Sequence, residues 1–288
     1  MSKPTHPAPF HLLGRLSPRS RAWRPLLELM LLVFIFLVGF IALTEGLHAA
    51  IGSRADDVLG HAAMAAALPA AFGAVALGGR RDPRTLLASE RSGQLTLMAA
   101  AFAVTFVVAG LARLGAAWVT DTVQPHRSSF SLSVLLLTLA LIAIAAFAEE
   151  VVFRAWLPQA LGVWTTSPWL AYGLTIPLFV LIHGTGDGWI GVVNHASMGI
   201  CLAVLAWRFN SVAASTAVHA ASNMVLVLAP ELLTTGPNMD HPIAVVTAKV
   251  IASALVTVLL CLWAPRPAQG RDTEAQGVDR HEELADTH

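Results

Sequence analysis

Charged residues are scarce in this chain of 288 residues. Asp, Glu, Lys and Arg make up 12% of the sequence, whereas a soluble domain carries about 25%. The 18 basic and 18 acidic residues balance, which argues against the basic surface that nucleic-acid-binding proteins present. Hydrophobic residues reach 56%. The composition therefore predicts a protein that lies mainly in lipid, with membrane lipids as partners and no nucleic acid.

Cysteine is equally rare, with only Cys201 and Cys261 in the whole chain. Both fall inside apolar runs, and neither belongs to a CxxC pair. This spacing argues against a disulfide framework and against a zinc knuckle. We interpret both residues as small core side chains.

Long apolar runs dominate what the sequence does contain. A helix needs about 20 mostly apolar residues to span a bilayer, and these runs lack the alternation of membrane barrel strands. The predicted fold class is all-α, a polytopic transmembrane helical bundle of about eight spans. The second run is short, and Pro177 interrupts the fifth. The eight runs cover residues 26–50, 62–77, 95–119, 132–148, 168–182, 189–207, 212–228 and 243–263.

The basic residues predict an orientation. If the eight runs cross in turn, all but four of the 18 basic residues fall on the side of the N-terminus. The exceptions are Arg54, Arg113, Arg127 and Lys249. Because Lys and Arg gather on the cytoplasmic side, both termini are expected in the cytoplasm and the protein in the plasma membrane. We predict a basic N-terminal segment at 1–24, a transmembrane domain at 25–264 and a polar tail at 265–288, with both end segments disordered.

Ionisable residues within apolar sequence are the main functional clue, because a charge at a helix centre in the bilayer costs about 2.5–3.5 kcal/mol. The fourth run ends in Glu149 and Glu150, with Arg154 four residues further on. Glu150 and Arg154 share a helix face and can pair. Glu149 lies about 100° away and is a candidate general base. The alternative is an ordinary helix end with charges at the membrane surface.

Two further groups carry imidazoles. Phe179 precedes His183 by one helical turn, so the aromatic ring can pack beside the imidazole. His219 and Asn223 have the same spacing inside the seventh run, where the amide can orient the imidazole or donate to an oxyanion. The alternative for this pair is hydrogen bonding between helices. His195, beside Asn194, has a predicted structural or substrate-facing role.

The ordered set Glu-Glu-x-x-x-Arg, Phe-x-x-x-His and His-x-x-x-Asn resembles the CAAX-protease and bacteriocin-processing (CPBP) family over about residues 130–230. That family includes the type II CAAX prenyl endopeptidases. The resemblance implies an intramembrane endopeptidase that hydrolyses membrane-associated or lipidated proteins and peptides. It also implies roles for the motif residues: Glu149 as the catalytic carboxylate supported by Glu150 and Arg154, His183 positioning the attacking water, and His219 and Asn223 stabilising the oxyanion.

No cofactor is expected. The chain lacks the His-Glu-x-x-His motif of the zincins, although Glu149, His183 and His219 together are a ligand set that zinc accepts. Two other functions stay open at this point. One is a transporter that uses the buried Glu and His residues as an ion path, and the other is a catalytically silent immunity or scaffold protein of the same fold.

Overall fold

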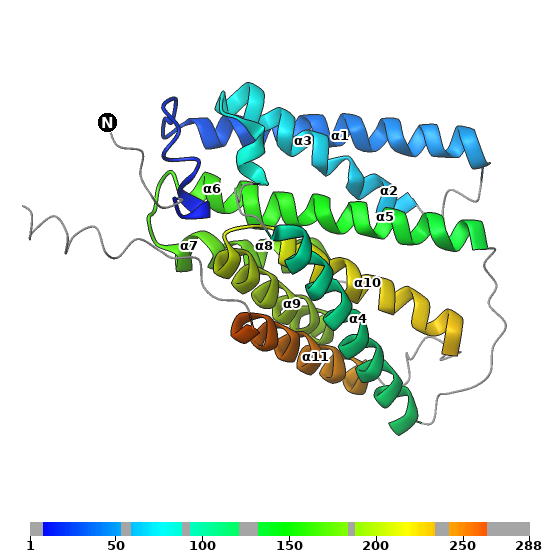
Figure 1. Cartoon of the computed structure of the whole chain (residues 1–288). Helices are drawn as coiled ribbons and strands as arrows, with labels where there is room; N and C mark the ends of the chain where they lie inside the picture. The colour runs from blue at the N-terminus through cyan, green and yellow to red at the C-terminus, as the bar shows by residue number, and fades with distance from the viewer. Residues whose placement is uncertain are drawn as a thin grey trace, which may run out of the picture.

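The computed structural model describes residues 8–52, 59–87, 93–120, 132–183, 188–233 and 242–263, and every regular element in these ranges is helical (Figure 1). The predicted all-α fold is confirmed. The elements are η1 (Phe10–Leu12), α1 (Arg24–Ile51), α2 (Leu59–Ala65), α3 (Ala67–Ala74), η3 (Val75–Gly79), η4 (Pro83–Leu86), α4 (Gln94–Val119), α5 (Leu132–Glu150), η5 (Val151–Trp156), α6 (Leu157–Leu161), α7 (Pro168–Gly173), α8 (Thr175–His183), α9 (Gly188–Phe209), α10 (Ala213–Leu233) and α11 (Pro242–Trp263).

Six helices or helix combinations are long and apolar enough to cross a membrane. Two shorter apolar helical segments, Pro168–His183 and Ala213–Ala229, accompany them. These eight segments coincide with the eight predicted runs. The chain is therefore an integral membrane protein.

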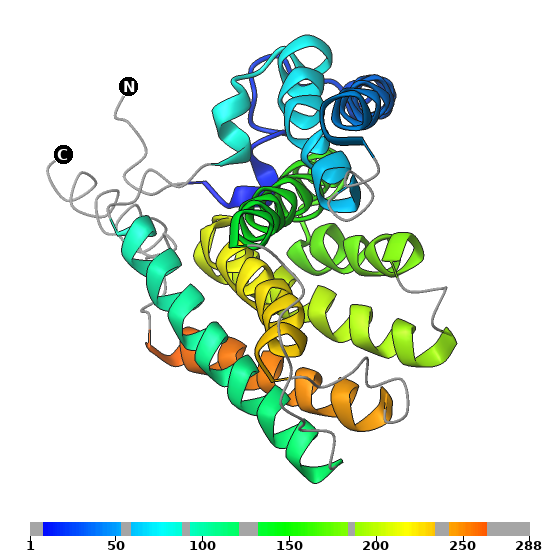
Figure 2. The same cartoon turned by 90° about the vertical axis from the view of Figure 1, so that its right-hand side faces the viewer.

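The helix that carries the two adjacent glutamates runs through the middle of the molecule. Helices α5, η5 and α6 form one continuous apolar segment, Leu132–Leu161. On one side it contacts α2, which adjoins α1 and α3, and on the other it contacts α10. Figures 1 and 2 show α4, α9 and α11 beyond α10, on the side away from α1. The carboxylates thus lie on a helix with protein on both sides.

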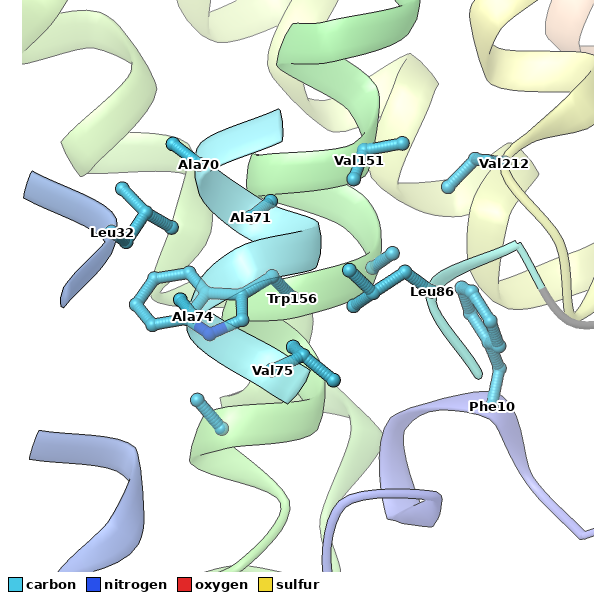
Figure 3. Packing of buried hydrophobic residues seen from close by; sticks show 12 residues of the cluster. Phe10, Leu32, Ala70, Ala71, Ala74, Val75, Leu86, Val151, Trp156 and Val212 are labelled. Carbon is cyan, nitrogen blue, oxygen red and sulfur yellow. The ribbon is translucent and has the colours of Figure 1, made fainter. Parts of the chain in front are cut away.

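Small side chains allow close packing between α3 and the central helix (Figure 3). Ala70, Ala71 and Ala74 have no exposed surface, and Trp156 packs into the same cluster. Small residues let helix backbones approach each other where lipid provides no hydrophobic drive between helices. This packing holds the N-terminal helices against the segment that follows the glutamates.

The expected disorder of residues 1–24 is wrong for residues 8–23, because this segment is folded against the helices. Phe10 is 1% exposed and belongs to the same buried cluster as Leu86 and Trp156. Its N–H donates to Asn210 Oδ1 at 3.3 Å. Burying such an aromatic side chain stabilises the contact by about 1.5–3 kcal/mol. Residues 1–7 and the predicted polar tail lie outside the described residues.

The fifth run is a broken helix. It begins at Pro168, where the Ser167 side chain accepts from the Leu170 N–H, as a helix N-cap does. Helix α7 ends at Gly173 and α8 begins at Thr175. Pro177 has no N–H to continue the ladder of hydrogen bonds. The turn between α6 and α7 reverses the chain, so that α8 returns to contact η5 of the central segment.

A buried polar network ties the first helix to the central one, and the sequence did not single it out. Glu28 on α1 pairs with Arg81 at 3.3 Å, both side chains being 5% exposed. Glu28 also accepts from the Trp156 indole N–H at 2.8 Å. Arg81 donates to Gln159 at 2.7 Å. The network therefore holds the C-terminal end of the central helical segment against α1 and Arg81.

Candidate active site

The glutamates lie where the central helix changes from α to π geometry. The π-helix η5 follows Glu150 directly, and it ends with the Leu157 N–H bonded to the carbonyl of Val152, five residues earlier. Such π segments are rare and occur often at functional sites. Glu149 is 7% exposed and Glu150 is fully buried. The alternative of charges at the membrane surface is therefore wrong for this pair.

Glu150 has a buried counter-ion. Its Oε1 lies 3.2 Å from Arg154 Nη1, and neither side chain has any exposed surface. The guanidinium carbon of Arg154 also lies 4.4 Å from the centre of the Phe179 ring, within the range of a cation–π contact. Because Arg154 is buried inside the protein, its charge is compensated there and does not contribute to the basic surface at the N-terminal end.

His219 joins this pair from α10. Its Nδ1 lies 2.9 Å from Glu150 Oε1. Because an ionised carboxylate only accepts hydrogen bonds, Nδ1 carries the proton and donates it. The other nitrogen, Nε2, then lies 3.8 Å from Glu149 Oε2. The sequence did not predict the Glu150–His219 bond, because its partners are 69 residues apart and no local spacing connects them.

His183 approaches the same oxygen from the end of α8. Its Nδ1 lies 3.0 Å from the carbonyl of Phe179, which again makes Nδ1 the donor. Its Nε2 lies 3.2 Å from Glu149 Oε2. The Phe179 and His183 rings are 4.4 Å apart. The aromatic ring thus packs beside the imidazole and restricts its rotation.

Three polar atoms converge at this point. Both imidazole Nδ1 atoms donate elsewhere, so each ring, when it is neutral, turns an unprotonated Nε2 toward Glu149. Glu149 Oε2 is itself buried and has no hydrogen-bond partner of suitable geometry. Acceptors at this spacing repel unless a proton lies between them or a donor such as water bridges them. The cluster is chemically suited to hold and deprotonate a water molecule.

The other polar residues of the motifs are less closely connected. Asn223 lies one turn after His219 on α10, is partly exposed and makes no side-chain hydrogen bond within the described residues. The His195 ring stacks on His183 with the two centres 5.5 Å apart. His195 thus borders the cluster from α9, and it adds an imidazole to the surroundings of His183.

No group of three or more His, Cys, Asp or Glu residues in the described ranges has the arrangement of a metal site. Both Nδ1 atoms donate to protein acceptors, an arrangement that metal-ligating histidines also show.

The sequence that contains this cluster matches a protein-family model. Residues 131–225 match the Rce1-like family, described as type II CAAX prenyl endopeptidases. The match agrees with the resemblance carried by the three motifs. No curated protein matches the chain.

The Rce1-like region extends from the start of α5 into α10, and it includes Glu149, His183, His219 and Asn223. It therefore contains every residue of the cluster described above. Helices α1 to α4 and α11 lie outside the matched residues. The Rce1-like family is a family of proteases, so the match supports a peptidase that acts within the membrane.

Proposed function

We propose that this protein is an intramembrane endopeptidase in which Glu149 activates a water molecule. One observation supports the proposal above all others. The Nε2 atoms of His183 and His219 lie 3.2 and 3.8 Å from the same buried oxygen of Glu149. Groups at this separation can share one bound water.

The proposed reaction is general-base hydrolysis. Glu149 takes one proton from the water while His183 holds it, and the oxygen attacks the carbonyl carbon of a peptide bond. The carbonyl oxygen becomes negative and accepts hydrogen bonds from the Asn223 amide and from His219, which for this step carries a proton on both ring nitrogens. Glu149 then returns its proton to the departing amine as the C–N bond breaks. The products are a carboxylic acid, which then ionises, and an amine.

Glu150 and Arg154 support this reaction without touching the substrate. The carboxylate of Glu150 holds His219 through Nδ1, so the ring presents Nε2 to the reacting atoms. The buried charge of Arg154 balances that of Glu150.

The proposed substrates are membrane-associated or lipidated proteins and peptides. A site built on apolar membrane helices is reached from the bilayer, where such substrates are concentrated. We further propose that the protein lies in the plasma membrane with both termini in the cytoplasm, as the distribution of its basic residues indicates. No metal is required by this mechanism.

The substitution Glu149→Gln tests the proposal. It keeps the shape of the side chain but removes the base, so cleavage should fall by about 100-fold or more while the folded protein remains. Cleavage is measured on a panel of prenylated and unmodified peptides in liposomes, with EDTA present throughout. Glu45→Gln is the matched control, because Glu45 is an exposed carboxylate on α1.

Each outcome separates the candidate functions. Equal cleavage by the wild type and Glu149→Gln would exclude Glu149 as the base. If the wild type cleaves nothing but conducts ions that Glu149→Gln blocks, the buried residues form an ion path. If it does neither, the protein is a silent member of its fold. Activity only after removal of EDTA and addition of zinc would replace the metal-free mechanism.

A further inference from the structure

A second group of intramembrane charges lies away from the candidate active site. Arg113 on α4 and Lys249 on α11 line one cavity of about 50 Å³ between α4, α10 and α11. This volume exceeds the roughly 10–15 Å³ that a single water requires. The two cations come from runs far apart in the sequence, and the tertiary structure brings them to the same hollow.

The two charges lack an acidic partner in the described part of the chain. No described carboxylate lies within 4.0 Å of Arg113 or Lys249, and no acidic residue lines the cavity. The Nε of Arg113 is buried without a hydrogen bond. The charge of Arg113 also acts unfavourably on that of Lys249. Paired like charges in an apolar surrounding are unfavourable unless an anion joins them.

The depth of the site indicates where an anion would come from. Arg113 lies six residues, or about 9 Å, before the end of α4 at Val119, and Lys249 lies about 10 Å after the start of α11 at Pro242. Helix α4 is about 39 Å long and exceeds the roughly 30 Å hydrocarbon core. With each helix centred in that core, Arg113 lies about 5 Å inside the hydrocarbon boundary and Lys249 about 9 Å, because α11 is only about 33 Å long. Long basic side chains reach from the hydrocarbon toward the headgroups.

The walls of the cavity indicate an amphipathic ligand. Val225, Leu226 and Val256 contribute aliphatic surface, and Leu226 is 49% exposed at its edge. The Thr105 hydroxyl is engaged with the Ala101 carbonyl at 2.6 Å. A ligand with a phosphate at the two cations and an acyl chain along the aliphatic wall satisfies both parts of the cavity.

We propose that Arg113 and Lys249 bind the phosphate of an anionic phospholipid in the leaflet opposite the basic N-terminal segment. The acyl chain of this lipid lies against α10, the helix that also carries His219. The proposal does not depend on the peptidase activity.

Lipid binding to the full-length protein tests this site. The purified protein is titrated in detergent with phosphatidylglycerol, phosphatidylcholine or inorganic phosphate, and bound molecules are counted by native mass spectrometry. We expect phosphatidylglycerol to bind at least 10-fold more weakly to the double variant Arg113→Gln, Lys249→Gln. The control Arg84→Gln removes an exposed cation near the other end of the bundle and should bind as the wild type does.

Three results would overturn the proposal. The first is equal binding of phosphatidylglycerol by the wild type and the double variant. The second is inorganic phosphate binding as tightly as the lipid, which would identify a soluble anion site. The third needs no variant and is an absence of charge dependence in the wild type. It would be seen as equal affinity for phosphatidylcholine and phosphatidylglycerol, or as binding of phosphatidylglycerol that high salt leaves unchanged.

Discussion

Glu149 and Glu150 are neighbours in the chain, yet their side chains have different partners. Glu150 bonds to His219 Nδ1 and pairs with Arg154, all of them buried. Glu149 faces the Nε2 atoms of His183 and His219 and has an oxygen without a hydrogen-bond partner. The step of about 100° between successive helical residues separates the two environments. One carboxylate is therefore fully engaged by the protein, and the other is available for chemistry.

This difference predicts that two similar substitutions affect the stability of the protein differently. Glu150→Gln removes the counter-ion of fully buried Arg154, and breaking a buried ion pair costs about 3–5 kcal/mol. We therefore expect Glu150→Gln to lower the thermal unfolding temperature in detergent markedly. Glu149→Gln and the exposed control Glu45→Gln should unfold near the wild-type temperature. If Glu150→Gln is as stable as the wild type, the pair with Arg154 is not a structural support.

At the scale of elements, the N-terminal segment folds against the turn between α6 and α7. The His11 ring is 4% exposed, and its Nε2 lies 3.1 Å from the Thr166 carbonyl. Gly162 is required there because an added Cβ would overlap the carbonyl oxygen of His11. A segment that the sequence predicted to be disordered is thus held by burial and by one close backbone approach.

Acidic pH should weaken this contact. Burial lowers the pKa of His11 below its usual 6.5, and this exceeds the opposing effect of the bond to Thr166. Below pH 6.5 the released segment gains a proton that the folded one does not, so the contact is strongest above that pH and weakens as the pH falls toward the folded pKa. Amide hydrogen exchange of residues 8–23, corrected for intrinsic rates, should show less protection at pH 5.5 than at pH 7.5.

The variant His11→Gln supplies the control for this experiment. It removes the titrating ring but retains a side chain that can donate to Thr166. Its protection should be the same at both pH values. Loss of protection on acidification in His11→Gln would assign the effect to another group.

At the scale of the whole molecule, basic residues gather at one end of the bundle. Arg24, at the start of α1, donates to the carbonyl of Gly79 at the end of η3. Arg81 donates to Gln159 of α6. The start of α1, the end of η3 and α6 therefore lie together. Arg113 and Lys249 line a cavity near the opposite ends of their helices. This distribution supports the predicted orientation with the N-terminal end in the cytoplasm.

Cysteine labelling of intact cells tests that orientation. Cys201 and Cys261 are first replaced by Ala, so that only the introduced thiol can react. In this background Thr120→Cys, at the end of α4, should react with a membrane-impermeant maleimide. Arg84→Cys, in η4, should react only after the membrane is permeabilised. The reverse pattern would place the N-terminal end outside the cell.

Several properties followed from the sequence alone. Continuous apolar runs determine helices in lipid, because the backbone must satisfy its hydrogen bonds internally. Four-residue spacings determined which side chains share a helix face, including the Glu150–Arg154 pair and the Phe179–His183 contact. The family resemblance rested on the same short motifs. All of these features depend on residues that are close together in the sequence, within one helix.

Only the tertiary structure decided how the helices meet. Sequence spacing does not show that His219 bonds to Glu150, that Glu28 pairs with Arg81, or that Arg113 and Lys249 share a cavity. Each of these contacts joins residues on different segments, and their geometry depends on side-chain packing between helices. The burial of Phe10 was also decided by the tertiary structure, because a single apolar residue in a polar segment gives no periodic pattern. Local chemistry thus determined the helices, and packing between them determined the partners of their charges.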